Sequence, residues 1–453
     1  MLIAVSLTLL VLALLYLYFM LVGIKFIGVR SNPFGLFFGI NFFVFSLPGI
    51  IFVYSPSLDT LLNSGIMSVS SSTIEYVTYA YFLSLLILMI MVFVASYVFR
   101  GFHVRKNCVS TIAQKNAVSR FIVISLWLNA SFILVLFQKI GINNIPLIES
   151  IRGDLGASHV LKAKLITGEI SKLPESVNQL FRILIPLTAY LSMDQCFSNN
   201  TMRKNKIVLF LSVIIAFIYF SYELQKAPVF IFIFGLIFIY SFHRGLKWKV
   251  MLSLPILLVA LLGVNAFYFN ITDLEDIMVL VEKVATRLFI MQNQGMYYIV
   301  EHISPNANYA KNGAILSSFI FSDMPRRADS VVMEIMYGYA EGNVNMNTYF
   351  LGQAYSIAGT VGIILGPFVI GSHLCLYLVI FKKLYKKNID FFMPISIVFY
   401  LFFVPINQGF NSFLYGRNVI FFVVFGFIIY CLYLLQTKNL FKKASFKGLS
   451  NES

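Results

Sequence analysis

The chain carries little charge. Lys, Arg, Asp and Glu together make up 12% of its 453 residues, about half the share found in soluble domains. Acidic residues are the scarcer kind, with 19 Asp and Glu against 34 Lys and Arg. Because hydrophobic residues reach 59% and the mean hydropathy is +0.83, the soluble and disordered classes are excluded.

Residues that typically ligate metals are also few. The four cysteines (Cys108, Cys196, Cys375 and Cys431) have no paired spacing, and the five histidines are scattered. We therefore expect neither a disulfide framework nor a zinc or iron–sulfur site. The sequence also lacks a Gly-rich nucleotide loop, a serine-nucleophile motif and HExxH. We predict no metal and no cofactor.

Long apolar runs are what the chain has instead. We find eleven, at about 2–22, 34–54, 75–99, 121–137, 180–197, 207–222, 228–242, 250–269, 355–380, 391–406 and 419–435. Their length suits a membrane-spanning helix, and they lack the alternation of barrel strands. The sequence predicts an all-α, polytopic helical membrane protein, with residues 1–453 forming one bundle. We interpret 2–22 as a retained span because no Lys or Arg precedes it and no cleavage pattern follows.

The cations are concentrated in alternate short loops. Six segments, beginning with residues 23–33 and ending with the basic tail at 436–453, hold 21 of the 34 Lys and Arg residues and almost no acid. The positive-inside rule assigns these segments to the cytoplasm. The N-terminus is then outside and the C-terminus inside. Because this placement explains the net charge of +15, we do not expect nucleic-acid binding.

Two long polar segments face outward in this topology. Residues 138–179 hold five cations and four acids, and residues 270–347 hold five cations and nine acids. Long loops of this kind are more often functional than idle. Within the second segment, Thr272–Glu275 fits a capping box, and the apolar residues after it recur at helical spacing. We predict an amphipathic helix there. Five polar side chains would share one of its faces: Lys283, Arg287, Gln294, Tyr298 and Glu301. A solvated face of a helix lying on the bundle explains the pattern equally well.

Small residues mark the run that follows this segment. Gly362 and Gly366 have the four-residue spacing that lets membrane helices approach closely. We expect this pair to serve helix packing rather than ligand contact.

Charged residues at the apolar boundary are costly and point to function. Four of them face outward: Arg182, Glu223, Lys226 and Arg417. With Arg152, Arg287, Arg326 and Arg327 they predict a basic rim suited to a ligand with a lipid tail and a phosphate or pyrophosphate head. Simpler roles stay open. Arg182 and Arg417 would snorkel to head groups, Glu223 and Lys226 would neutralise each other, and Arg326 and Arg327 would be an exposed loop pair.

The chain resembles bacterial O-antigen polymerases, which join oligosaccharide repeat units on a polyprenyl carrier. The resemblance covers most of the length and rests on weak local patterns: Glu149-Ser-Ile-Arg152-Gly153, Gln225-Lys226-Ala227-Pro228, Arg287-Leu288 followed by Gln294-Gly295, and Asn347-Thr348 before Gly359 and Gly362. The chain departs from an Arg-x10-Gly pattern of some members, since Ala163 and Tyr298 stand at the glycine positions. Eleven spans with an outside N-terminus is a second departure.

The resemblance implies a GT-C-like bundle in the bacterial inner membrane, acting on undecaprenyl-pyrophosphate-linked oligosaccharides at the periplasmic face. Its partners would be membrane lipids, a chain-length regulator and a flippase. Arg287 and Arg152, with Lys226, would stabilise the departing pyrophosphate. Glu301, His302 or Glu341 would accept the acceptor's proton. The substrate would be bound by the remaining candidates, which are Glu223, Arg182, Lys283, Gln294, Tyr298, Arg326, Arg327 and Arg417.

Three alternatives stay open at this point. An O-antigen ligase would share the layout but transfer to the lipid A core. A lipid-linked oligosaccharide flippase or other transporter would be marked by an internal repeat and by charges deep in the spans. A membrane scaffold without catalytic activity would tolerate substitution of Arg152 and Arg287.

Overall fold

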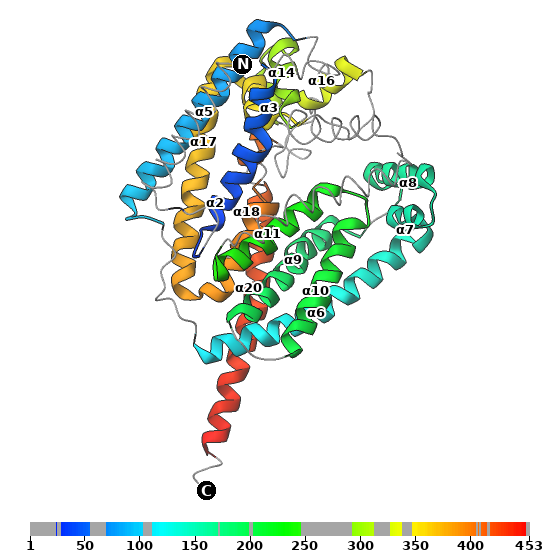
Figure 1. Cartoon of the computed structure of the whole chain (residues 1–453), viewed down its shortest axis with the longest axis vertical. Helices are drawn as coiled ribbons and strands as arrows, with labels where there is room; N and C mark the ends of the chain where they lie inside the picture. The colour runs from blue at the N-terminus through cyan, green and yellow to red at the C-terminus, as the bar shows by residue number, and fades with distance from the viewer. Residues whose placement is uncertain are drawn as a thin grey trace.

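The computed structural model describes residues 24, 29–54, 69–102, 111–170, 173–198, 203–245, 292–311, 327–337, 347–404, 406, 409–414 and 417–449. Every regular element in these ranges is a helix (Figure 1). In chain order they are α2 (Pro33–Phe38), the π-helix η1 (Gly39–Ser46), α3 (Leu47–Phe52), α5 (Ser71–Val98), α6 (Ile112–Ile140), η2 (Ile142–Asn144), α7 (Pro146–Ile151), α8 (Leu155–Thr167), α9 (Glu175–Ser198), α10 (Arg203–Ser221), α11 (Lys226–Arg244), α14 (Gln294–His302), η4 (Ala307–Lys311), α16 (Ala328–Tyr337), α17 (Tyr349–Lys387), α18 (Ile389–Phe402), α19 (Phe410–Leu414) and α20 (Arg417–Leu449).

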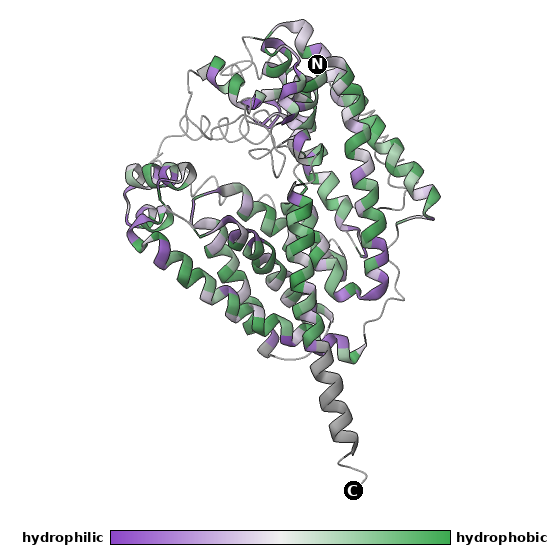
Figure 2. Cartoon of the chain, turned by 180° about the vertical axis from the view of Figure 1, so that it is seen from behind, coloured by the Kyte–Doolittle hydropathy of each residue, from purple (hydrophilic) through white to green (hydrophobic). Residues whose placement is uncertain are grey.

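Six stretches of this described part are long and apolar enough to cross a membrane. They are Pro33–Ile51, Ser71–Val98, Ile112–Ile140, Ala227–Arg244, Tyr349–Lys387 and Asn418–Gln436. Two shorter apolar helices, Asn205–Ser221 and Ile389–Phe402, accompany them. Figure 2 shows hydrophobic residues along the long helices. The prediction of a helical membrane protein is therefore supported. The predicted spans at 2–22 and 250–269 lie outside the described residues, so the total of eleven stays a prediction.

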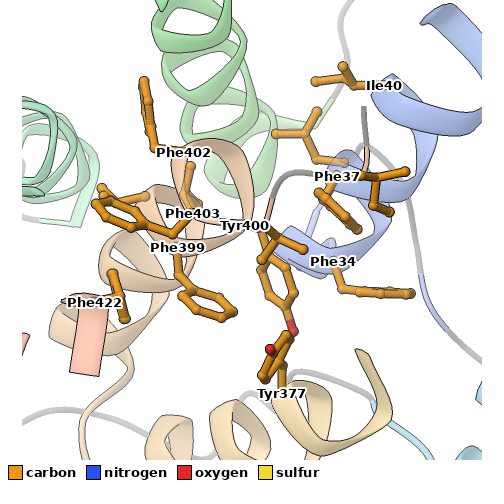
Figure 3. Packing of buried hydrophobic residues seen from close by; sticks show 14 of the residues in the cluster. Phe34, Phe37, Ile40, Tyr377, Phe399, Tyr400, Phe402, Phe403 and Phe422 are labelled. Atoms are coloured by element: carbon orange, nitrogen blue, oxygen red, sulfur yellow. The ribbon is translucent and has the colours of Figure 1, made fainter. Parts of the chain in front are cut away.

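Helices α9 and α18 form the centre of the bundle. Helix α9 contacts α6, α10, α11, α18 and α20, and its side chains from Ile183 to Ser192 are all buried. Helix α18 also packs against α2 and α17. Its Tyr400 lies 5.7 Å from the ring of Phe34, and its Phe399 lies 4.7 Å from the ring of Phe422 (Figure 3). Interlocking aromatic side chains supply van der Waals contact, which drives helix association in lipid.

One end of the bundle gathers the loops that the sequence predicts to be cytoplasmic. We call it the basic end; it comprises residues 30–32, 99–102, 111–115, 194–198, 242–244 and 382–390. Asn32 Nδ2 donates to Phe102 O at 3.2 Å, and Lys382 Nζ donates to Gly101 O at 2.6 Å. Arg30 N donates to Phe242 O at 3.2 Å. These bonds join segments assigned to one side, as the alternation of spans requires.

The opposite end, here called the loop end, comprises residues 69–73, 141–170, 173–182, 222–226, 292–311, 327–337, 347–360, 402–404, 406 and 409–414. Helices α7 and α8 fill the first predicted outward segment, and Leu147 N in α7 donates to Tyr222 O at 3.3 Å. The second segment contains α14, η4 and α16, with Asn306 N donating to Ser356 O at 2.8 Å. The described parts of both segments are therefore folded against the bundle. Figure 1 shows α14 and α16 at the top and α7 and α8 at the right.

Helix α17 is broken at Gly359, whose φ of 60° and ψ of −138° are open essentially only to glycine. The piece before the break folds back over the piece after it. A Cβ at Gly362 would lie 1.9 Å from Ala354 O, although residues eight apart in a straight helix are about 12 Å apart. The predicted close packing at Gly362 and Gly366 is confirmed. Its partner is the chain's own preceding segment, including Ala354 and Phe350, rather than a separate helix.

Candidate functional site

The predicted polar stripe from Lys283 to Glu301 is interrupted by a turn in its described part, whereas Lys283 and Arg287 lie outside the described residues. Helix α14 begins only at Gln294, after a turn at Gln292–Asn293. Asn293 Nδ2 donates to Ser46 O at 2.7 Å, which pins this turn to the end of the π-helix η1. A turn held by a distant segment interrupts the periodicity that the sequence suggested.

Gln294 and Tyr298 lie inside the fold rather than on an open face. They are 4% and 0% exposed, and Gln294 Nε2 donates to Tyr298 Oη at 3.3 Å. The ring of Tyr298 stacks on that of His302, with centroids 6.3 Å apart. Burial at this level favours a role for Gln294 and Tyr298 in packing α14 against the rest of the fold. His302, in contrast, is exposed.

Glu301 docks α14 onto the start of α5. Ser70, the N-cap of α5, donates from Oγ to Glu301 Oε2 at 2.8 Å. Hydrogen bonds from Thr73 and from Ser70 hold the pKa of Glu301 below its ordinary value. A general base works best with a pKa near the operating pH. This geometry therefore favours docking for Glu301, and its predicted role as proton acceptor stays a prediction.

Replacing Glu301 with Gln is expected to speed hydrogen exchange in residues 294–302 at neutral pH. The folded-state pKa is lowered, so the carboxylate stabilises the docked state above its unfolded pKa of about 4.3 and loses this effect as pH falls further. Exchange rates corrected for intrinsic chemistry should therefore converge for wild type and variant below about pH 4. Glu149→Gln, on α7, is the control. A constant difference at every pH would contradict the docking role.

Two predicted arginines are paired with acids nearby in the chain. Arg152, whose side chain is 51% exposed, donates to Glu149 Oε1 at 2.5 Å and to Asn143 Oδ1 at 3.2 Å. Arg327 donates to both carboxylate oxygens of Asp329, which is buried at the start of α16. The structure thus places Arg152 in the α7 region, apart from Glu301 and His302 on α14 (Figure 1).

Arg182 lies near the loop end of α9 and contacts the end of α18. Its Nη2 donates to Phe402 O at 3.3 Å, and its Cζ lies 5.5 Å from the centroid of Phe403. A cation is favourable at a helix C-terminus, where backbone carbonyls lack partners. The side chain is nevertheless exposed. The guanidinium of Arg182 is therefore held against the end of α18, although the residue as a whole is exposed.

Glu223 belongs to the same group of side chains. It lies in the turn between α10 and α11, where Tyr222 Oη donates to Oε1 at 2.7 Å and Gln225 Nε2 donates to Oε2 at 2.6 Å. Arg182 and Glu223 both lie within electrostatic range of Tyr219. Helix α11 begins at Lys226, directly after this turn. Glu223 precedes this helix, and the side chain of Lys226 lies outside the described residues, so the predicted pairing of the two stays a prediction.

The structure therefore brings together Arg182, Glu223 and the backbone start of α11. It separates them from Gln294, Tyr298, Glu301 and His302, which belong to α14. Of the other candidates, Lys283, Arg287, Arg326 and Glu341 lie outside the described residues. The side chains of Lys226 and Arg417 also lie outside them, although Arg417 begins α20.

One pair was missed by the sequence reasoning. Asp194, on α9, lies 2.7 Å from Nε2 of His243 on α11 through its Oδ1 atom, and its side chain is 3% exposed. The signal was present, because Asp194 lies inside the predicted span 180–197, three residues before its end. Such a residue is a functional candidate by position alone. Its partner is 49 residues away in the chain, beyond the reach of local patterns.

Comparison of the chain with family models, with curated proteins and with solved structures finds no match. Across the described ranges, no group of three His, Cys, Asp or Glu side chains could hold a metal ion. The site is thus defined by its own geometry: an exposed arginine held by α18, a carboxylate in electrostatic range of the same tyrosine, and a helix start at one end of the bundle.

Proposed function

We propose that the protein polymerises polyprenyl-pyrophosphate-linked oligosaccharide repeat units at the periplasmic face of the inner membrane. The observation that carries the proposal is the position of Arg182. It is exposed at the loop end of the central helix α9 and is held by the C-terminus of α18. In this proposal the loop end faces the periplasm, as the distribution of Lys and Arg predicts. The resemblance to O-antigen polymerases supports the choice of substrate.

The reaction transfers the growing chain from its carrier to an incoming unit. An acceptor hydroxyl attacks the anomeric carbon, the bond from that carbon to the pyrophosphate oxygen breaks, and its electron pair stays on the pyrophosphate. Arg182 would stabilise this charge, because a guanidinium fork matches phosphate oxygens and stays protonated. Glu223, a predicted substrate-binding residue in electrostatic range of the same Tyr219 as Arg182, would receive the hydroxyl proton. The predicted contribution of Arg287 and Arg152 stays part of the proposal.

Deleting the gene in its host tests the reaction class. A polymerase mutant should produce lipopolysaccharide capped with a single repeat, because ligation continues while chain growth stops. Lipopolysaccharide with an uncapped core would instead indicate a ligase. Electrophoresis of extracted lipopolysaccharide distinguishes the two patterns, and expression of the intact gene in the deletion strain is the control. An unchanged ladder of polymer would contradict the proposal.

The buried Asp194–His243 pair favours one second candidate, a transporter of the lipid-linked oligosaccharide. Charged residues inside spans often serve proton relays in transporters. The two functions differ in the fate of the substrate. A transporter would leave the repeat units unjoined on the cytoplasmic leaflet when the gene is deleted, whereas a polymerase would leave them unjoined but exposed to the periplasm. Accessibility of the sugar to an impermeant lectin separates these outcomes.

A further inference from the structure

The contact between Asp194 and His243 is incompletely paired. Oδ1 of Asp194 lies 2.7 Å from His243 Nε2, whereas Oδ2 is buried and bonds with no described residue. A buried carboxylate that lacks partners is costly while it is charged. The pair avoids this cost when one proton is shared between them, either as imidazolium with carboxylate or as imidazole with carboxylic acid.

The charged groups on the surrounding helices compensate only partly for the negative charge that the pair would carry without its proton. Lys115 of α6 and Asp390 of α18 lie within electrostatic range of Asp194 and act in opposite directions. On α10, Lys206 is in electrostatic range of Cys196, which follows Asp194 by two residues on α9. Helix α20 contributes Tyr433, which is in range of Asp390, and α11 adds Arg244 beside His243.

His243 gives the buried carboxylate a connection to solvent. Its side chain is 19% exposed, and it is the second-last residue of α11 at the basic end. The ring of Phe197 stacks on it at 5.7 Å between centroids, and Arg244 lies over that same phenylalanine ring. The imidazole is thus fixed in orientation while one edge remains open, so a proton can exchange through it.

We propose that Asp194 and His243 form a buried proton-binding site that holds one exchangeable proton and ties α9 to α11 at the basic end. The ligand is a proton drawn from water at that end. Helix α9 contacts five other helices and also carries Arg182. Loss of the proton therefore weakens the packing of this central helix against its neighbours. This inference does not depend on the reaction proposed for the loop end.

The pH dependence of thermal unfolding tests the proposal on the full chain in detergent at a fixed scan rate. In this proposal the folded pair retains the proton, because Oδ2 of Asp194 is buried without another hydrogen-bond partner among the described residues. Stability from the site is therefore complete below the unfolded pKa of about 6.5 and is lost as pH rises. The wild-type midpoint should decline above about pH 6.5. Asp194→Asn removes the charge that needs the proton, so its midpoint should become flat in that range.

A second variant should keep a pH-dependent midpoint but shift its decline to lower pH, in contrast to Asp194→Asn. His243→Gln leaves Asp194 as the only group that can take the proton. Its midpoint should therefore begin to fall at a lower pH, above about 3.9, where an unfolded carboxylic acid ionises. Asp390→Asn is the control, because it removes a neighbouring charge but keeps the pair and should retain the wild-type decline. Equal shifts of the midpoint at every pH in both variants would show an ordinary buried hydrogen bond and overturn the proposal.

If Asp194→Asn does not fold, nitrogen-15 NMR of wild-type protein with labelled histidines tests whether His243 holds the proposed proton. His243, assigned by its loss in His243→Gln, should stay protonated to a higher pH than the other histidines. Titration together with the exposed His302 would contradict the proton site.

Discussion

Arg182→Ala is expected to reduce polymer formation by about 100-fold or more, since removing one preorganised donor to developing charge costs about 10²–10³ in rate. The guanidinium is held against Phe402 O and Phe403, so alanine removes both the charge and its fixed position. The measurement is the distribution of chain lengths in a deletion strain that expresses the variant. The amount of protein in the membrane must match wild type.

Arg244→Ala is the matched control for this prediction. Arg244 also lies over a phenylalanine, Phe197, at 5.7 Å, but at the basic end of the bundle. We expect it to leave the polymer length unchanged. Arg182→Lys should fall between alanine and wild type, because lysine keeps the charge but lacks the bidentate fork. Full-length polymer from Arg182→Ala at normal abundance would remove Arg182 from the site.

Gly362→Ala is expected to destabilise the protein by about 1–3 kcal/mol or more, the usual cost of overpacking a well-packed core. The added Cβ would lie 1.9 Å from Ala354 O, and a backbone atom cannot turn away as a flexible side chain can. Gly359→Ala should cost about 1–3 kcal/mol for a different reason, because its φ of 60° and ψ of −138° strain any residue with a Cβ. Thermal unfolding of purified protein measures both effects.

Gly426→Ala provides the control within another long apolar helix, α20. Its added Cβ would meet Phe422 at 3.8 Å, an ordinary contact, so the midpoint should stay unchanged or rise slightly. If Gly362→Ala and Gly359→Ala behaved like Gly426→Ala, the fold at the break in α17 would be contradicted.

Much of the helical framework could be predicted, because membrane spans need long uninterrupted apolar runs and the residues themselves supply that signal. The alternation of basic loops also anticipated which segments meet, as the bond between Arg30 and Phe242 illustrates. The break at Gly359 could not be predicted. A glycine within a span more often serves packing, and here an added Cβ at Gly359 would also lie 3.2 Å from Pro305, a residue of the preceding segment.

The candidate site was predicted less completely, and the reasons differ by residue. Arg152 and Glu149 are three residues apart, a spacing at which side chains meet on a helix, so their pairing was available from the sequence. The turn before Gln294 depends on Ser46, 247 residues away, and no local pattern reports such a contact. The partner of Asp194 could not be predicted for the same reason, because it is far away in the sequence. The unusual position of Asp194 inside a predicted span was visible in the sequence.

Reconstitution tests the central claim most directly. The purified protein, placed in liposomes with a defined polyprenyl-pyrophosphate-linked repeat unit, should produce a ladder of longer lipid-linked chains and release polyprenyl pyrophosphate without added nucleotide. The Arg182→Ala protein, prepared in the same way, should leave the repeat units unjoined. Wild-type liposomes that consume no substrate, or that only move it between leaflets, would contradict the polymerase account.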